Sequence, residues 1–217
     1  MSGDHHDHIH AGHDHHHAHD AVHAHEPRPE YRRLERAVRE LLIAKGVLSA
    51  DEIRAQIELM DSRTPAIGAK IVARAWSDPA YKARLLADAR KAAEEFGVDT
   101  SNTAIVVALE NTDTLHHMVV CTLCSCYPKA IIGVPPAWYK SSAYRARAVV
   151  EPRKVLAEFG THLADDVEIR VVDSTADMRY LVLPKRPAGT QGWSEERLAA
   201  LVGRDSLIGT AVPRADA

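Results

Sequence analysis

The chain has 217 residues, enough for one domain of ordinary size with an appendage and too few for two full enzyme domains. Hydrophobic residues make up 46% and charged residues 26%, both within the globular range, and the formal charge of −3 argues against a nucleic-acid partner. All three cysteines lie between 121 and 126, so the chain cannot form a disulfide framework or, by itself, a four-cysteine zinc or iron–sulfur site.

The N-terminal segment is rich in histidine. Of the 14 histidines, 11 lie within the first 25 residues, and Asp4, Asp7, Asp14 and Asp20 are interleaved with them, unlike the uninterrupted run of a purification tag. Because this segment has little apolar surface and imidazole binds cobalt, nickel, copper and zinc, we predict a disordered metal-binding tail over 1–29. No run could act as a signal peptide or cross a bilayer, so we expect a cytoplasmic protein with no membrane partner.

Residues 30–97 show helical periodicity. Leu34 and Val38 recur at helical spacing, and Ser49 with Glu52 forms a capping box. The predicted helices end at Gly46, open at Ser49, follow Pro65, and run from Asp78 to Gly97. Their apolar stripes are narrow and aromatic residues are few, so we expect 30–97 to be a helical arm that packs on a partner subunit.

From residue 98 the pattern becomes extended. Strands are predicted at 105–109, 118–120, 167–173 and 178–183, the last two joined by the turn STAD. Helices are predicted from Pro152 to Gly160 and after Ser194. The fold class is α+β without internal repeats, and 98–217 is expected to be the catalytic domain.

The cysteine cluster VCTLCSCYP places Cys121, Cys124 and Cys126 directly after a strand. Three buried thiols, or a redox pair, would be an ordinary structural explanation. A structural zinc site would need a fourth ligand from His116 or His117, whose spacing is unlike that of a zinc knuckle, so packing or support of the ligands is the more favoured role for both.

A third interpretation uses the single residue between Cys124 and Cys126. If both sulfurs bind one metal, the backbone nitrogens of Ser125 and Cys126 can join the same plane in one six-membered and two five-membered rings. Cys121 can then approach along the axis, which leaves the opposite position open for water or substrate. Amide nitrogens bind only after losing their protons, so a trivalent cobalt or iron fits and zinc, magnesium or calcium does not. An open position on such an ion is a catalytic site.

These residues carry a family resemblance. The cluster VCTLCSCYP, with LENT at 109–112 and GVPPAWYKSSAYRARAVVEPRKVLAEFG at 133–160, resembles the α subunit of nitrile hydratase. The likeness continues in MDSRTPAIGAKIVARAWSDPAYKARLL at 60–86, DSTADMRYLVLPKRP at 173–187 and DSLIGTAVP at 205–213. Thr122 and Tyr127 resemble the cobalt type, so cobalt(III), one per subunit, is favoured over iron(III).

The resemblance implies further chemistry. The globular domain would be a layered α/β/β/α fold, with Cys124 oxidised to a sulfinic acid, Cys126 to a sulfenic acid and Cys121 kept as an axial thiolate. The family's β subunit supplies arginines to those oxygens, so an αβ heterodimer or α2β2 heterotetramer is implied, with an activator or metallochaperone for loading. The reaction would be hydration of a small nitrile to its amide, with the Cys126 oxygen or an activated water as nucleophile.

Two alternatives stay open at this point. The family commonly has Trp-Pro where this chain has Lys129-Ala130, and a Gln is often found at the position of Asn102. These differences keep the γ subunit of thiocyanate hydrolase in view, since its substrate is an anion that a lysine would suit. A histidine-rich cobalt storage protein or metallochaperone is the non-enzymatic alternative. Trp138 and Tyr139 either line the pocket or anchor the chain.

Overall fold

The computed structural model describes residues 29–101 and 103–215, so the predicted tail over 1–29 lies outside the described residues except for Pro29. The main helices are α2 (Pro29–Ala44), α3 (Ala50–Ser62), α4 (Ala66–Ser77), α5 (Pro79–Ala87), α6 (Ala89–Glu94), α8 (Ser142–Val150) and α9 (Pro152–Glu158). Shorter helical turns are α7 (Lys129–Ile132), η1 (Ala137–Lys140), α10 (Glu195–Ala199) and α11 (Arg204–Ile208). The strands are β1 (Ile105–Glu110), β2 (Leu115–Val120), β3 (Glu168–Asp173) and β4 (Met178–Leu183).

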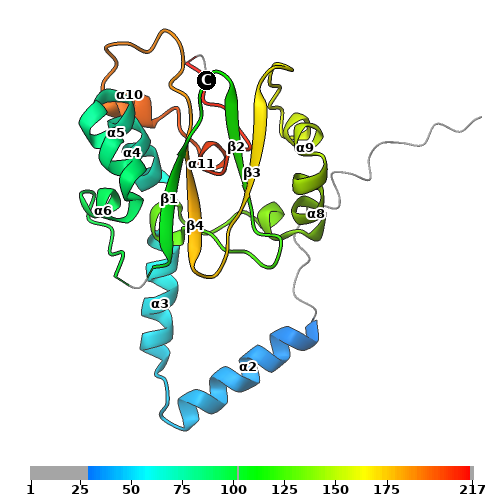
Figure 1. Ribbon diagram of the computed structural model, residues 1–217. Helices are drawn as coiled ribbons and strands as arrows, with labels where there is room; N and C mark the ends of the chain where they lie inside the picture. Colours follow the sequence, from blue (N-terminus) through cyan, green and yellow to red (C-terminus); the bar gives the residue numbers. More distant parts are fainter. Residues whose placement is uncertain (1–28, 102, 216–217) are drawn as a thin grey trace, which may run out of the picture.

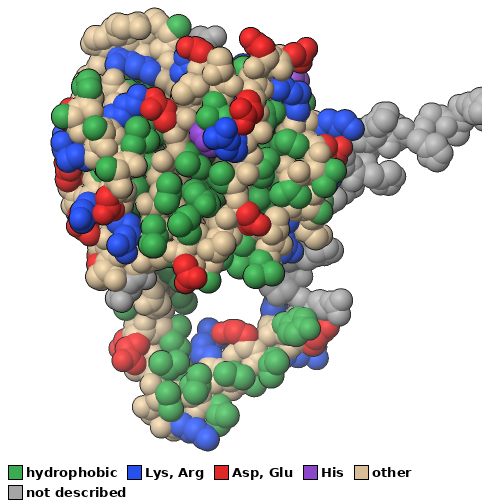
Figure 2. All heavy atoms as spheres, viewed as in Figure 1, with side chains coloured by type: hydrophobic (Ala, Val, Ile, Leu, Met, Phe, Trp, Pro, Cys, Tyr) green, Lys and Arg blue, Asp and Glu red, His purple; other side chains and the backbone are tan. Residues whose placement is uncertain are grey.

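Helices α2 and α3 form an arm that projects from the body of the molecule (Figure 1). The predicted capping box opens α3: Ser49 N–H donates to the Glu52 carboxylate at 2.7 Å, and Glu52 N–H donates to Ser49 Oγ at 3.1 Å. Neither helix buries a residue. Hydrophobic side chains nevertheless lie along α2 (Figure 2), where Tyr31 and Leu34 are each 59% exposed. The arm is therefore a pair of amphipathic helices with an uncovered apolar side.

Helices α4, α5 and α6 lie on the body instead. Ile71, Val72, Tyr81 and Leu85 are fully buried. Small residues make this close packing possible, since a side chain at Gly68 would come within 2.7 Å of two apolar side chains from α7 and α11. The arm is thus shorter than the predicted 30–97, because these narrow apolar stripes pack on the chain's own strands and helices.

The predicted helix from Asp78 to Gly97 is two helices. Asp78 caps α5 as expected, accepting hydrogen bonds from Ala80 N at 2.8 Å and Tyr81 N at 3.1 Å. Asp88 then adopts an extended conformation and its carboxylate accepts hydrogen bonds from the first turn of α6. An aspartate that caps a new helix competes with continuation of the previous one, which explains the break.

The four strands form two parallel pairs. β1 pairs with β4, and β2 pairs with β3, so the turn STAD connects strands of different sheets. Helices α4, α5, α6 and α10 cover the β1–β4 side and α8 and α9 cover the β2–β3 side, which gives the layered α/β/β/α arrangement (Figure 1). The predicted α+β class is confirmed, while the sequence pattern predicts neither α8 nor α11.

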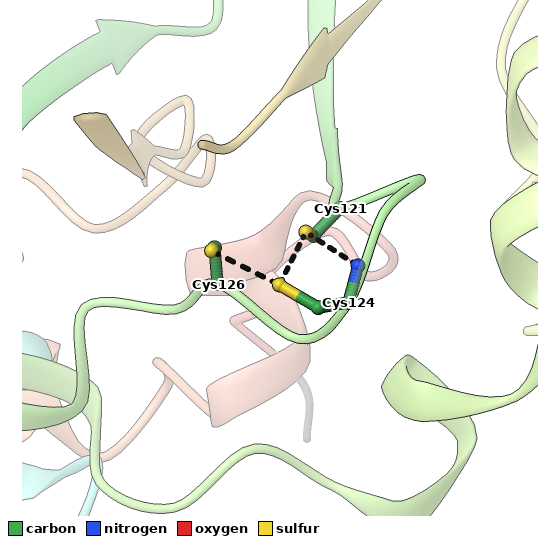
Figure 3. A group of neighbouring side chains, drawn as sticks. All are labelled: Cys121, Cys124 and Cys126. Atoms are coloured by element: carbon green, nitrogen blue, oxygen red, sulfur yellow. Dashed lines mark hydrogen bonds between the residues drawn. The ribbon is translucent and has the colours of Figure 1, made fainter. Parts of the chain in front are cut away.

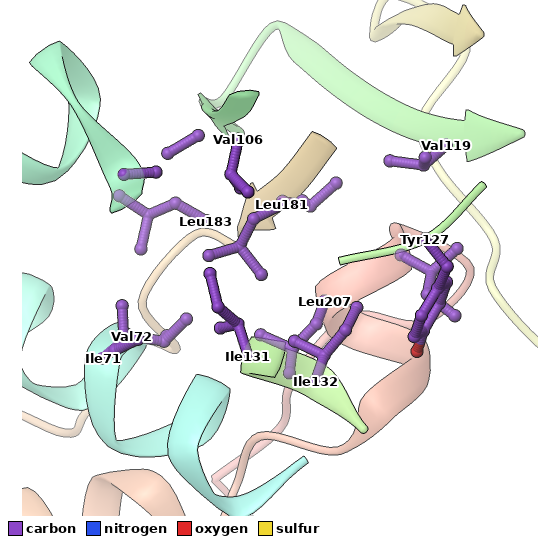
Figure 4. Close-up of a cluster of buried hydrophobic side chains, with 14 of the residues drawn as sticks. Ile71, Val72, Val106, Val119, Tyr127, Ile131, Ile132, Leu181, Leu183 and Leu207 are labelled. Atoms are coloured by element: carbon purple, nitrogen blue, oxygen red, sulfur yellow. The ribbon is translucent and has the colours of Figure 1, made fainter. Parts of the chain in front are cut away.

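The hydrophobic core extends through the body, and the part of it beside the cysteine loop lies between the β1–β4 pair and helices α4, α7 and α11 (Figure 4). Val106 and Leu181 face Ile131, Ile132 and Leu207, all of them buried. Helix α7 follows the cysteine loop directly, so burial of its two isoleucines anchors one end of that loop. No helix among the described residues is long and apolar enough to cross a membrane.

Candidate metal centre

The three cysteines lie on the loop that joins β2 to α7. Val120, the last residue of β2, pairs with Asp173 at the end of β3, and Cys121 is the next residue. Folding brings the three sulfur atoms to one point (Figure 3). Cys121 Sγ lies 3.4 Å from Cys124 Sγ, which lies 3.2 Å from Cys126 Sγ. The geometry therefore matches the predicted convergence of the three thiols.

Exposure differs among the three thiols. Cys121 is fully buried, Cys126 is half-buried and Cys124 is exposed. The backbone N–H of Cys124 donates a hydrogen bond to Cys121 Sγ at 3.2 Å, which folds the loop back on the end of β2. Cys121 thus lies on the buried side of the cluster, and Cys124 and Cys126 lie on the side nearer to solvent.

The surroundings of Cys124 and Cys126 shift the pKa values of their thiols in opposite directions. Hydrogen bonds from the Cys126 and Cys121 thiols lower the pKa of Cys124 to about 7, and the backbone N–H groups of Ser125 and Cys126 act in the same direction. Burial raises the pKa of Cys126 to about 12, against the opposing charge of Arg179. Cys124 therefore ionises first, and a metal has to displace the Cys126 proton.

Side chains from three elements, β3, η1 and α8, hold the loop. Thr122 donates its backbone N–H to Asp173 Oδ1 at 3.0 Å and its hydroxyl to the other carboxylate oxygen. The Tyr139 hydroxyl donates to the Cys126 carbonyl oxygen at 2.9 Å, and the Tyr144 hydroxyl donates to the Val119 carbonyl oxygen at 2.7 Å. Arg145 adds a hydrogen bond to the Thr122 carbonyl oxygen. The loop is fixed by hydrogen bonds at both of its ends.

The two predicted aromatic candidates, Trp138 and Tyr139, anchor the chain. Trp138 packs between Tyr144 and Phe159, with ring centroids 4.8 and 4.6 Å away. Tyr139 is fully buried; its hydroxyl donates to the Cys126 carbonyl oxygen, and its ring packs edge-on against Tyr127 of the same loop, with ring centroids 5.2 Å apart. Neither lines the cavity beside the cysteines.

The paired histidines are buried structural groups. Asn111 Nδ2 donates to His116 Nδ1 at 3.1 Å, and Asn111 Oδ1 accepts the His117 backbone N–H at 2.7 Å. His116 Nε2 lies 2.7 Å from the Gly209 carbonyl oxygen and donates to it in the neutral tautomer. Burial lowers the pKa of both imidazoles. The expectation that they pack rather than bind metal agrees with these contacts.

A cavity of about 380 Å³ opens beside the cysteines and is lined by Cys124, Ser125 and Cys126. Three basic residues, Arg63, Lys129 and Arg179, also line it. The sequence analysis singles out Lys129 but not the two arginines. Arg179 lies within β4, opposite Val106 of β1, and no sequence motif marks it as part of a site because strand pairing places it there.

The donor set fits a transition metal. The sulfur atoms of the three cysteines all lie within 4.8 Å of one another, and no histidine, aspartate or glutamate within the described ranges joins this group. Thiolates are soft ligands that suit cobalt, iron or zinc and not magnesium or calcium. Three sulfurs leave coordination positions on such a metal for further donors.

Comparison with known proteins decides the family. The sequence model described as "Nitrile hydratase, alpha chain" matches residues 29–211. The chain belongs to the nitrile hydratase alpha-chain family. It is 56% identical over 179 residues to the low-molecular weight cobalt-containing nitrile hydratase subunit alpha of Rhodococcus rhodochrous, covering 82% of this chain and 86% of that one.

Two further relatives show that the similarity extends to proteins with other names. It is 46% identical over 192 residues to the thiocyanate hydrolase subunit gamma of Thiobacillus thioparus, covering 83% of this chain and 79% of that one. A solved Fe-type nitrile hydratase double mutant from Comamonas testosteroni Ni1 superposes with a TM-score of 0.83 at 41% identity, over 88% of this chain and 93% of that one. The family resemblance and the predicted fold are both confirmed.

Proposed function

We propose that this chain is the α subunit of a cobalt-dependent nitrile hydratase, which adds water to small nitriles to give amides. The observation that carries the proposal is the convergence of Cys121, Cys124 and Cys126 on one loop, in a chain of the nitrile hydratase alpha-chain family. Cobalt is the metal named in the 56% identical relative.

The metal ligands would be the sulfurs of Cys121, Cys124 and Cys126 and the backbone nitrogens of Ser125 and Cys126. One trivalent cobalt held there would supply Lewis acidity, which polarises a nitrile or lowers the pKa of a water molecule. Oxidation of Cys124 and Cys126 to sulfinic and sulfenic acids is part of the proposal. Their exposure supports it, because Cys124 and Cys126 border the cavity whereas Cys121 is buried.

The chain's own residues position these groups. Asp173 holds Thr122, and Tyr139 holds the Cys126 carbonyl oxygen, so the loop keeps its shape when the sulfurs acquire charge. Arg179 places a positive charge near Cys126 and lines the same cavity. That charge would stabilise an oxygen anion on Cys126, the group proposed, with an activated water, as nucleophile.

A β subunit is proposed as the partner, in an αβ heterodimer or α2β2 heterotetramer. The arm has an apolar groove between α2 and α3, whose lining includes Leu34, Val38, Leu42 and Ile53. Burial of such a groove stabilises a complex by about 25 cal/mol per Å² of apolar surface. The exposed Cys124 side of the cluster would also gain its remaining hydrogen-bond donors from this partner.

Loading of the metal would involve the histidine-rich tail over 1–29. We propose that its 11 histidines in the first 25 residues gather cobalt for the cysteine loop, with an activator or metallochaperone as a further partner. Deleting residues 1–26 should lower cobalt occupancy in cobalt-limited cells and leave it unchanged at excess cobalt. Unchanged occupancy under limitation would contradict this role.

The test of the main function uses the chain co-expressed with its β subunit in cobalt-supplemented medium. Metal analysis should find one cobalt per α subunit, intact-mass measurement of the peptide containing 121–126 should count the added oxygens, and propionitrile should be converted to propionamide. A fully metallated complex that forms no amide from small nitriles would overturn the proposal and favour a cobalt-storage role.

Thiocyanate hydrolysis is the second candidate function. The 46% identity to a thiocyanate hydrolase subunit gamma and the basic residue Lys129 at the cavity support it. Thiocyanate with two waters gives carbonyl sulfide, ammonia and hydroxide. Release of carbonyl sulfide at a rate above that of amide formation would favour this function, as would a complex of three different subunits.

A further inference from the structure

The described side chains that line the cavity beside the cysteine loop carry positive charges and no negative ones. Arg63, Lys129 and Arg179 line it from three separate elements, the end of α3, the start of α7 and β4. No aspartate or glutamate is among its lining residues. Three positive charges around one small cavity raise the local concentration of anions and favour an anionic ligand within it.

Two of these cations, Lys129 and Arg179, lie in the cavity without a counter-charge among the described residues that line it. Arg179 Nη1 is buried without a hydrogen-bond acceptor, and neither Arg179 nor Lys129 forms an ion pair within the described part of the chain. Arg63 differs, because its charge acts on nearby Asp99. A buried guanidinium nitrogen without an acceptor is costly, so Arg179 is a donor that an incoming anion would satisfy.

The cavity's size limits what can enter. Its volume of about 380 Å³ is near the lower end of the range for small-molecule sites, and Cys124, Ser125 and Cys126 form one of its walls. A ligand of a few heavy atoms can therefore contact the cysteine loop with one end while its other end lies near the cations. Val106, Ala130 and Ile131 supply the apolar part of the lining.

We propose that this cavity selects substrates in which the C≡N group is carried on an anion, with Lys129 and Arg179 as the specificity-determining residues. The inference rests on the proposed function, since it names the substrate class of the same site. Cyanocarboxylates and thiocyanate share this chemistry. Hydration of a cyanocarboxylate forms a bond from the water oxygen to the nitrile carbon, moves both water protons to nitrogen, and needs no oxidant or reductant.

The experiment compares kcat/KM of the cobalt-loaded complex for cyanoacetate and for propionitrile, which differ in that cyanoacetate has a carboxylate where propionitrile has a methyl group. The intact complex should prefer cyanoacetate, and raising the salt concentration should reduce that preference because screening weakens the attraction. Thiocyanate, followed by carbonyl sulfide release, is measured in parallel. Turnover of cyanoacetate or of thiocyanate in preference to propionitrile supports anion selection. The relative rates of these two anions show whether the cavity favours a cyanocarboxylate or thiocyanate.

Variants of Arg179 and Lys129 test whether these residues cause the preference for the anionic substrate. Arg179→Gln should lower the cyanoacetate-to-propionitrile ratio by about tenfold or more, and exposed Lys129→Gln should lower it by about threefold, chiefly through KM for cyanoacetate. Because the Arg179 charge also acts on Cys126, Arg179→Gln should slow both substrates as well, so the ratio is the readout for this variant. Arg179→Lys and Lys129→Arg keep the charge and should restore part of the ratio. Lys70→Gln, an exposed change on α4 outside the cavity, is the matched control and should leave the ratio unaltered.

Three outcomes would overturn the inference. They are a preference of the intact complex for propionitrile, an unaltered ratio in both glutamine variants, and an equal loss for both substrates that follows loss of cobalt. In the last case the cations would balance the charge of the cysteine cluster and not that of the substrate. Failure of the proposed function would look different, since a metallated complex would then hydrate neither nitrile.

Discussion

The arm and the body of this chain differ in how far their helices are buried. Helices α2 and α3 bury no residue, whereas α4 alone buries six, among them Ile71 and Val72. Both regions have amphipathic helices, yet only the body supplies strands for them to pack on. The body thus packs through its own contacts, and the uncovered apolar side of the arm supports the proposal that it packs on a second chain.

The cysteine loop has features of both regions, because one side of it is buried in the body and the other side is exposed. On the buried side, Cys121 Sγ accepts a hydrogen bond from the Cys124 backbone, and Thr122 and Tyr139 form hydrogen bonds within the same chain. Its outer side has an exposed Cys124 and a cationic cavity with an unpartnered Arg179 nitrogen.

Replacing Cys126 by serine should abolish amide formation and reduce cobalt content, since the hydroxyl is a poor ligand for this metal and cannot form a sulfenic acid. The body should keep its fold, because Cys126 is only half-buried. Metal analysis, nitrile turnover and circular dichroism of the complex check the three statements. An active and fully metallated Cys126→Ser variant would refute the assigned ligand role.

The double change Leu34→Glu with Val38→Glu should prevent assembly with the β subunit, because it places two charges in the apolar groove of the arm. Thermal unfolding of the isolated α chain should change little, since both residues are exposed. Size-exclusion chromatography with light scattering measures assembly. Arg36→Gln, on the same helix, is the control, and a normal complex from the double variant would contradict the arm's role.

Asp173→Asn should weaken the hold on the cysteine loop, because the amide nitrogen cannot accept the Thr122 hydrogen bond that the carboxylate oxygen accepts. We expect cobalt affinity to fall by about 10- to 100-fold, as for other residues that orient metal ligands. Asp177→Asn, in the exposed turn before β4, is the matched control. Equal cobalt retention in both variants against a competing chelator would exclude a positioning role for Asp173.

The body should lose stability as the pH falls below about 6.5, the ordinary value for histidine. Burial lowers the pKa of His116 and His117 in the folded state, so below this pH the unfolded chain binds protons that the folded chain does not. Stability therefore rises with pH through this window. The thermal midpoint at pH 7.5 and 5.5 measures the slope, which should be smaller in His116→Gln.

Ser125→Ala should have the mildest effect. The backbone nitrogen, the proposed ligand, is retained, and only the hydroxyl that could hydrogen-bond to oxidised sulfur is lost. Cobalt content should stay normal, with turnover lowered by less than about tenfold, the cost of roughly one hydrogen bond. Loss of cobalt from this variant would show that the side chain and not the backbone of Ser125 supports the metal.

Prediction from sequence was most successful where the signal is local. The capping box at Ser49 and Glu52, the Asp78 cap and all four strands were predicted from short patterns, since these depend on neighbours within a few residues. The break at Asp88 was missed, because a capping aspartate within a helical pattern is ambiguous. The length of the arm was overestimated, because a narrow apolar stripe does not say which surface will cover it.

The amino-acid sequence alone predicts the ligands of the proposed metal site, because Cys121, Cys124, Ser125 and Cys126 lie within six residues and the proposed chelate rings depend on this short spacing. The tertiary structure decides what surrounds that site. Pairing of β1 with β4 brings Arg179 to the cysteine loop, and pairing of β2 with β3 brings Asp173 to Thr122. These contacts join residues more than fifty positions apart, and no local pattern encodes a strand register between such distant segments.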